Sequence, residues 1–377
     1  MASSDRLAPG LTSGDAMVLI GTTKGLFTLH SADGRDRFDL AGPAFPGEEV
    51  YATCIDARSG QTRVFTGSVS NHWGPVLRRS DDLGATWTED AQAALTFPEG
   101  TDASLARIWQ LAAGPSDQPD VLYAGVEPAA LFRSDDGGRS FSLVRGLWDH
   151  PHRTQWQPGG GGLCLHTVLV HPQQPERLLI AISAAGVYRS EDGGASWEAS
   201  NRGIVVGFVP EGEQLEFGQC VHKVARDAAD TERLYLQHHG GIYRSDDGGR
   251  TWSAMTGIAG MDFGFPVVAH PTRASTAYLL PLESDDYRCT PGGACIVWRT
   301  TDAGATWEPL TRGLPQRDAH LTVLRDAFTT DGQDPAGLYF GTRTGEVYAS
   351  VDSGDSWRLV ANHLPPVLSV RAAPVAT

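Results

Sequence analysis

The sequence contains almost no lysine. Of its 30 basic residues only Lys24 and Lys223 are lysines, and the arginines form no basic cluster. Together with a formal net charge of −15, this composition argues against nucleic acids and anionic membrane surfaces as partners. No apolar run reaches the length of about 18 residues that a membrane-spanning helix needs, so no such helix is expected.

Cysteine is scarce as well. The chain has five cysteines, an odd number whose spacing forms no disulfide framework, which favours a reduced, cytoplasmic protein. The sequence leaves open whether Cys289 and Cys295 pair to close a short loop. Residues 1–15 are rich in Ser, Gly and Ala and lack an apolar run, so we expect a disordered leader there and not a signal peptide.

One short pattern recurs along the rest of the chain: Ser or Thr, then Asp, Gly and a second Ser or Thr at alternate positions, followed by an aromatic residue. Six copies begin at residues 80, 134, 190, 245, 300 and 350, and a worn seventh copy begins at Ser31 with Asp33 but lacks the aromatic residue. The Asp carboxylate can accept hydrogen bonds from turn amides, and Gly permits a positive φ. The pattern therefore predicts a staple for a hairpin, with the aromatic residue as an apolar anchor between units, and not a catalytic carboxylate.

Each unit also contains four short strand-like runs, here called A to D, which is typical of a propeller blade. The first unit begins at residues 18–21 with a run that matches strand B, and the chain ends with a spare run at residues 367–371. The sequence predicts an all-β protein: a single seven-bladed β-propeller over residues 16–377, with four-stranded antiparallel blades. A C-terminal strand A is expected to join the N-terminal strands B–D and to close the ring.

The boxes resemble the BNR or Asp-box repeats of the sialidase superfamily, sortilin-type domains, xyloglucanases and photosystem II assembly-factor propellers. The resemblance covers nearly the whole chain and extends to bacterial proteins labelled BNR-repeat glycosyl hydrolase or exo-alpha-sialidase. It implies the propeller fold and a glycosyl hydrolase-like activity. A true sialidase is not expected, because those enzymes resemble six-bladed propellers with an arginine triad, and Arg107-Ile108-Trp109 is a poor match to their Arg-Ile-Pro motif. Xyloglucanases pair two such propellers, whereas this chain has one.

Propeller topology places the D–A and B–C connections on the face opposite the Asp boxes. Three long connections are expected there, at residues 142–163, 198–218 and 282–294, and long loops in a compact repeat usually serve binding. Strand A lines the channel, so its first residues should point towards the axis on that face. Aligning the units places one residue of each strand A at a matching position: Tyr51, Trp109, His166, His222, Phe265, Leu321 and Leu368.

Two neighbouring units repeat a local pattern, Cys164-Leu165-His166 and Cys220-Val221-His222. Residues two apart in a strand share a face, so these side chains can converge, with His239 of a B–C loop nearby. We expect His166, His222 and His239 to bind a divalent metal such as zinc, copper or iron, or to act as general acid and base. They could instead bind a polar ligand without chemistry, or merely satisfy buried backbone groups. A cysteine of the pattern could add a soft ligand or pack between blades.

The long connections supply further candidates. Catalytic roles are expected for His222, His166, His150 and Arg153. Acidic or basic groups that precede strand A, Glu216, Asp262 and His320, are candidate acids or bases. The ligand-binding set comprises Trp109, Tyr51, Trp156, Phe265, His320 and Glu216. The run of glycines at 159–162 could let the backbone approach a ligand.

Two classes of function follow. The first is an enzyme, a hydrolase or lyase, that acts on a small polar or sugar-like substrate in a pocket lined by His and Trp and is helped by a metal. The second is a non-catalytic propeller that binds a ligand or a protein. The His and aromatic residues favour the first class, although the sequence shows no pair of carboxylates of the kind that most glycosidases use. The oligomeric state is not predicted.

Overall fold

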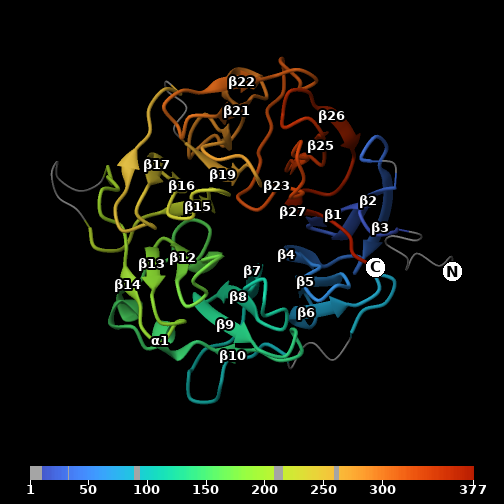
Figure 1. Ribbon diagram of the computed structural model, residues 1–377. Helices are drawn as coiled ribbons and strands as arrows, with labels where there is room; N and C mark the ends of the chain where they lie inside the picture. Colours follow the sequence, from blue (N-terminus) through green and yellow to red (C-terminus); the bar gives the residue numbers. More distant parts are fainter. Residues whose placement is uncertain (1–10, 33, 89–93, 208–214, 259–262) are drawn as a thin grey trace.

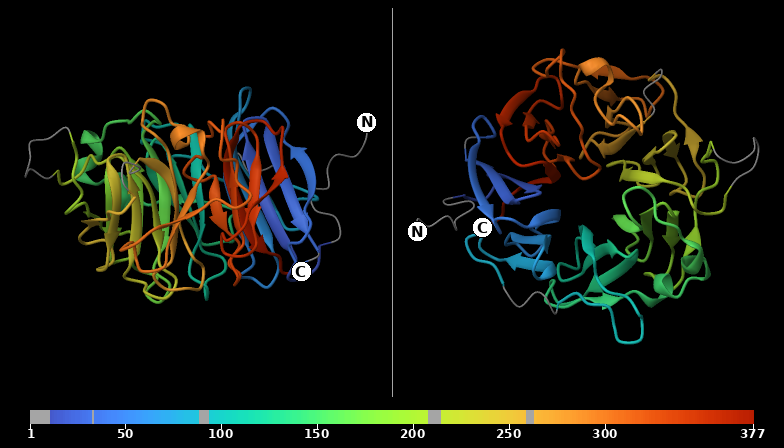
Figure 2. Two further views of the ribbon diagram at one scale, coloured as in Figure 1. Left: turned by 90° about the horizontal axis from the view of Figure 1, so that it is seen from above. Right: turned by 180° about the vertical axis from the view of Figure 1, so that it is seen from behind.

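Seven antiparallel sheets stand like blades around a central axis (Figure 1). The computed structural model describes residues 11–32, 34–88, 94–207, 215–258 and 263–377. The predicted seven-bladed β-propeller is confirmed, and seen from the side its blades form a short cylinder (Figure 2).

The blades follow the chain order. The first contains β27 (Val367–Pro374), β1 (Ala16–Thr22), β2 (Gly25–Ser31) and β3 (Asp39–Ala44). The second contains β4 (Glu49–Asp56), β5 (Arg63–Ser70) and β6 (Gly74–Ser80). The third contains β7 (Arg107–Ala113), β8 (Leu122–Glu127), β9 (Ala130–Ser134) and β10 (Ser142–Leu143), and is followed by α1 (Arg145–Trp148) and the 3-10 helix η2 (Pro151–Gln155).

The remaining four blades each have four strands. The fourth contains β11 (Cys164–Val170), β12 (Leu178–Ser183), β13 (Gly186–Ser190) and β14 (Glu198–Ala199). The fifth contains β15 (Val221–Arg226), β16 (Leu234–His238), β17 (Gly241–Ser245) and β18 (Ser253–Ala254). The sixth contains β19 (Gly264–Ala269), β20 (Ala277–Pro281), β21 (Val297–Thr300) and β22 (Glu308–Leu310), with the 3-10 helix η3 (Pro291–Gly293) between β20 and β21. The seventh contains β23 (Phe328–Thr330), β24 (Leu338–Gly341), β25 (Val347–Ser350) and β26 (Arg358–Ala361).

Within the described residues, which do not include 89–93, the second blade has three strands. The amide of Thr88 donates a hydrogen bond to the carbonyl oxygen of Arg79, 2.9 Å away. This bond lies where the outermost strand begins to pair in the other blades, so the described part of blade two agrees with the repeat.

The ring is closed by the C-terminal strand, as predicted. Strand β27 pairs antiparallel with β1, from Ala16 opposite Pro374 to Thr22 opposite Val367, so both ends of the chain contribute to blade one (Figure 1). The described end of the expected leader also packs here. Leu11 is buried, and the amide of Gly14 donates a hydrogen bond to the carbonyl oxygen of Val375. Residues 11–15 therefore belong to the fold, which corrects that part of the leader prediction.

The Asp boxes are hairpin staples, as their residues predict. In the box that starts at Ser190, the Asp192 carboxylate accepts hydrogen bonds from the Ser196 amide at 2.9 Å and the Ser196 hydroxyl at 2.6 Å. It also accepts the Ser190 hydroxyl, and the Ser190 oxygen accepts the Gly194 amide at 2.8 Å. These bonds hold the pKa of Asp192 at about 2, chiefly through the Ser196 hydroxyl. The Asp192 carboxylate therefore stabilises the hairpin turn through its hydrogen bonds.

Aromatic side chains fill the spaces between neighbouring blades. The box residue Trp252 is 3% exposed and its indole nitrogen donates to the carbonyl oxygen of Ser200, which lies just after β14 of the preceding blade. Five blades each bury a tyrosine almost completely. Four of these residues lie in the second strand of their blade, Tyr123, Tyr235, Tyr278 and Tyr339, and Tyr188 lies in the third strand, β13. The hydrophobic effect on these large side chains therefore joins each blade to the next.

All five cysteines are free thiols, so Cys289 and Cys295 do not close a loop by a disulfide. The described part of the chain has no helix of a length and hydrophobicity suited to crossing a membrane.

Candidate functional site

A cavity of about 490 Å³ opens at one mouth of the central channel. Its walls come from the starts of the A strands and from the two kinds of connection expected on this face. Arg288 and Arg343 lie in B–C connections, and Arg325 and Gly161 lie in D–A connections. This cavity lies on the face opposite the Asp boxes, where the long connections were expected, and a second cavity of about 470 Å³ lies at the other mouth, lined by residues of the A–B turns such as His171 and His270.

The matching residues of strand A sit at β-bulges. The pairing of strand A with strand B shifts register around Tyr51, Trp109, His166 and His222, and between Gly264 and Val267 in the sixth blade. A bulge inserts an extra residue and re-aims its side chain. Of the aligned residues, five line the cavity: Tyr51, Trp109, His222, Phe265 and Leu368.

His166 does not line the cavity, which corrects its assignment as a catalytic residue and metal ligand. The side chain is fully buried, with Nε2 3.0 Å from the carbonyl oxygen of Val221 and Nδ1 3.0 Å from the hydroxyl of Thr167. Burial, reinforced by the charge of Arg325, keeps its pKa well below the ordinary value. His166 is a neutral residue that satisfies polar groups between two blades.

The register predicted for the seventh blade is also wrong. Strand β23 begins at Phe328, and the amide of Gly341 in its partner strand donates to the carbonyl oxygen of Ala327. The position that matches the other bulges is therefore Asp326, which lines the cavity, and Leu321 lies in the connection before the strand. Leu321 is buried and its backbone pairs with Thr290.

Three candidates in the connection after β10 lie away from the cavity, and two of them contact blade four. The indole nitrogen of Trp156 donates to the hydroxyl of Tyr188 at 2.8 Å, and Nε2 of His150 is 3.2 Å from the carbonyl oxygen of Trp197. The guanidinium of Arg153 covers the ring of Trp148. Helices α1 and η2 direct these residues outward, whereas Gly160 and Gly161 of the same connection return to the cavity wall.

Glu216 and His320 are not among the residues that line the cavity. Glu216 is exposed beside His152, and Nδ1 of His320 is 2.9 Å from the hydroxyl of Tyr287. Asp262 and the worn-box residue Asp33 lie outside the described residues.

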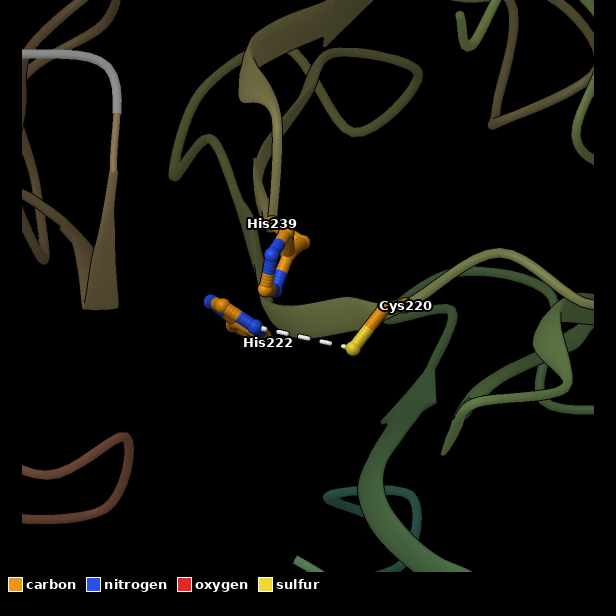
Figure 3. Close-up of side chains that lie close together, drawn as sticks. All are labelled: Cys220, His222 and His239. Atoms are coloured by element: carbon orange, nitrogen blue, oxygen red, sulfur yellow. Dashed lines mark hydrogen bonds between the residues drawn. The ribbon is translucent and has the colours of Figure 1, made fainter. Parts of the chain in front are cut away.

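Cys220, His222 and His239 form the most compact group of potential metal ligands on the wall (Figure 3). One ligand atom from each residue lies within 4.8 Å of the others. Nδ1 of His222 is 2.6 Å from the carbonyl oxygen of Gly264, so this nitrogen carries the proton and Nε2 keeps its lone pair, 3.7 Å from Sγ of Cys220. Burial, with a further contribution from Arg325, lowers the pKa of His222 to about 3, and burial raises the pKa of the Cys220 thiol.

Three arginines of the wall were not singled out from the sequence: Arg288, Arg325 and Arg343. None of them forms an ion pair with another described residue. Arg325 lies over the ring of Trp109, and Arg288 lies over that of Phe265. His239 was predicted as a site residue because it lies in a B–C connection. Arg288 and Arg343 lie in such connections too, so the same reasoning would have found them.

A buried ion pair crosses the channel beneath the cavity. The ammonium of Lys223 is 2.6 Å from Oδ1 of Asp326 and 3.1 Å from the amide oxygen of Gln110. These three residues come from the fifth, seventh and third blades. The pair neutralises Asp326, so the guanidinium groups of the wall keep an uncompensated positive charge.

Comparison with known proteins agrees with this architecture. Residues 243–254 match the family pattern described as BNR/Asp-box repeat. The GH74 xyloglucanase structure from Xanthomonas campestris superimposes with a TM-score of 0.59 at 17% identity and covers 93% of this chain and 55% of that one. The chain is a seven-bladed β-propeller that carries Asp-box repeats. A structure of YCF48 bound to D1 peptide shares the fold, with a TM-score of 0.52 at 13% identity over 92% of this chain and 85% of that one.

Curated relatives of this propeller include two fungal enzymes. A xyloglucanase of Hypocrea jecorina (strain QM6a) is 23% identical over 82% of this chain and 32% of its own length. An oligoxyloglucan-reducing end-specific xyloglucanase of Emericella nidulans is 24% identical over 77% of this chain and 39% of its own length. The propeller thus spans about a third of the length of these relatives.

Proposed function

We propose that this propeller is an enzyme, a hydrolase or lyase, that acts on a small polar, sugar-like substrate in the axial cavity. The observation that carries the proposal is the composition of that cavity, in which aromatic walls, guanidinium groups and a neutral imidazole face one space. A volume of about 490 Å³ falls within the range of about 300–1,000 Å³ that small-ligand pockets occupy. The resemblance to xyloglucanases supports a saccharide as the substrate.

The aromatic residues suit the apolar face of a sugar ring. Trp109 and Tyr51 lie side by side with ring centroids 5.0 Å apart, and Phe263 and Phe265 form a second pair at 5.5 Å. Glu127 accepts a hydrogen bond from the Trp109 indole nitrogen at 3.0 Å, and Glu49 accepts one from the Tyr51 hydroxyl at 2.8 Å. Because these contacts fix the rings of Trp109 and Tyr51 before a ligand enters, binding costs little side-chain entropy there.

The charge of the wall selects an acidic substrate. Arg288, Arg325 and Arg343 have no ion pair among the described residues, and the carboxylate of Asp326 is held by Lys223. Arginine stays protonated at all physiological pH values and can bind a carboxylate through two parallel hydrogen bonds. The substrate class is therefore a saccharide with a carboxylate or a similar anionic group, although the chain as a whole is negatively charged.

His222 is the candidate general base as long as no metal ion occupies its Nε2. Its Nδ1–H is held by the Gly264 carbonyl oxygen, and its depressed pKa keeps Nε2 unprotonated at neutral pH. Asp326 is the sole carboxylate among the described residues of the wall, and its ion pair with Lys223 occupies it. The cavity thus lacks the two free carboxylates on which most glycosidases rely.

The test is a panel of acidic and neutral oligosaccharides, assayed for new reducing ends and for unsaturated products. We expect turnover of an acidic member, and an increase in KM of at least about tenfold for Arg343→Gln, as expected for the loss of one charged hydrogen bond. Arg250→Gln is the matched control, because Arg250 lies in an Asp box on the opposite face. If an acidic saccharide binds without turnover, the propeller is a non-catalytic binding protein. If no saccharide binds, or if Arg343→Gln leaves binding unchanged, the proposal is wrong.

A further inference from the structure

Cys220, His222 and His239 form a group of potential metal ligands that the binding of a sugar does not require. Cys220 comes from the connection before β15, His222 from β15 itself and His239 from the turn between β16 and β17, so one blade supplies all three (Figure 3). All three also line the cavity. We propose that they bind one divalent transition-metal ion, with Zn²⁺ as the best match, at the mouth of the channel.

The distances fit a single ion. Zinc lies about 2.3 Å from a cysteine sulfur and about 2.0–2.1 Å from a histidine nitrogen, so two such ligands on a tetrahedral ion stand about 3.5 Å apart. Sγ of Cys220 and Nε2 of His222 are 3.7 Å apart. All three ligand atoms lie within 4.8 Å of one another. A small inward movement of the His239 side chain, which is half exposed, would bring its nitrogen to bonding distance of the same ion.

The surroundings hold the ligands in place. The carbonyl oxygen of Gly264 accepts Nδ1–H of His222 and directs the Nε2 lone pair towards Cys220. The amide of His239 donates to the carbonyl oxygen of Cys220 at 3.0 Å, which ties the two segments together. Oδ2 of Asp285 lies 3.2 Å from Nε2 of His239 and can orient that ring. Histidine ligands of metal ions usually have partners of this kind, and those partners tune the affinity for the metal.

The ligand set identifies the class of ion and its use. One thiolate and two imidazoles suit zinc and its neighbours in the first transition row, and sites with three protein ligands keep a position open. That position would face the cavity, because each ligand lines it. An ion there would act as a Lewis acid on a substrate oxygen or on water. The nearby guanidinium groups of Arg288 and Arg325 favour an anionic oxygen as the fourth ligand.

Metal binding can be measured without any substrate. Protein purified without a polyhistidine tag is treated with a chelator, desalted and titrated with Co²⁺, whose thiolate complex has a charge-transfer band in the near ultraviolet. We expect one Co²⁺ per chain, a band that Zn²⁺ abolishes, and a ratio of one Zn²⁺ per chain by elemental analysis after desalting.

The variants assign the site. Cys220→Ser should lose the thiolate band, and His239→Ala should weaken Co²⁺ binding at least tenfold. Neither change removes a fully buried side chain, so both proteins should fold. Cys289→Ser and His320→Ala are the matched controls, because neither residue belongs to the group, and both should bind Co²⁺ like the wild type.

The proposal is overturned if the chelated protein takes up no stoichiometric Co²⁺, or if Cys220→Ser keeps both the band and the affinity. Its failure is distinct from that of the proposed function. If the protein binds one Co²⁺ but turns over no saccharide, the metal site is supported and the proposed function is not. If the chelator-treated, metal-free protein still turns over a saccharide, the ion takes no part in the reaction.

Discussion

Removal of residues 365–377 is the most direct test of how the propeller closes. The deletion eliminates β27 and with it Val367, Leu368, Val370 and Val375, each no more than 5% exposed. Burial of a side chain of this size stabilises a protein by about 1.5–3 kcal/mol, so the four together contribute at least about 6 kcal/mol. That loss is comparable to the whole stability of an ordinary domain, about 5–15 kcal/mol. The shortened chain should therefore lose its cooperative thermal transition.

The assay is circular dichroism during heating, with a rearranged chain as the control. In the control, residues 365–377 precede residue 11 through a short glycine-serine linker, which is feasible because the amide of Gly14 bonds to the carbonyl oxygen of Val375. The rearranged chain should melt near the wild-type temperature, since it restores β27 beside β1. A shortened chain that melts cooperatively at the wild-type temperature would refute the argument that β27 holds the ring together.

Three further outcomes are expected. Lys223→Met leaves the buried carboxylate of Asp326 with only Arg371, 3.6 Å away, as a cationic partner, so urea unfolding should show a loss of up to about 3–5 kcal/mol, and an unchanged midpoint would contradict the ion pair. Hydrogen bonds from the hydroxyls of Ser196 and Thr306 hold the pKa of Asp192 and Asp302 at about 2, below the ordinary value of 3.8. Their contribution to stability is therefore complete above pH 4 and is lost as the pH falls towards 2, and a melting temperature that stays constant over this window would exclude it. His150→Ala should leave ligand affinity in a calorimetric titration unchanged, because His150 faces Trp197 and not the cavity.

The fold could be predicted because its determinants are local and repeated. Each Asp box fixes one hairpin through bonds between residues at most four positions apart, as Ser190, Asp192 and Ser196 show. Such a box needs no information from distant parts of the chain. The missing first strand and the spare last one then left a single way to complete seven blades, and β27 takes that place.

The site could be predicted only in part, because it depends on which side of a strand a neighbouring blade covers. Cys164-Leu165-His166 and Cys220-Val221-His222 are alike in sequence, yet Nε2 of His166 meets the carbonyl oxygen of Val221 whereas His222 reaches the cavity. No local pattern distinguishes the two histidines, since their difference arises from contacts between blades.

The register of blade seven failed for a different reason. Residues 321–324 alternate in a way that resembles a strand, and Leu321 and Val323 are indeed buried. Their burial comes from a connection that pairs with Thr290 and not from strand A of the blade. An alternating apolar pattern shows only that every second side chain is buried. A connection that packs over the core produces the same pattern as a strand.

The bulges explain how one repeat can build an asymmetric site. Each bulge in strand A adds a residue beyond the regular ladder, so its side chain can change without disturbing the hydrogen bonds of the blade or the Asp box at the other face. The second and third blades place Tyr51 and Trp109 there, the fifth places His222, and the seventh has Asp326 at the equivalent position just before β23. An aromatic wall, a neutral imidazole and a paired carboxylate thus occupy equivalent positions of the same scaffold. The chemistry of the cavity is therefore independent of the repeat that creates it, which is why Asp boxes alone do not determine what such a propeller binds.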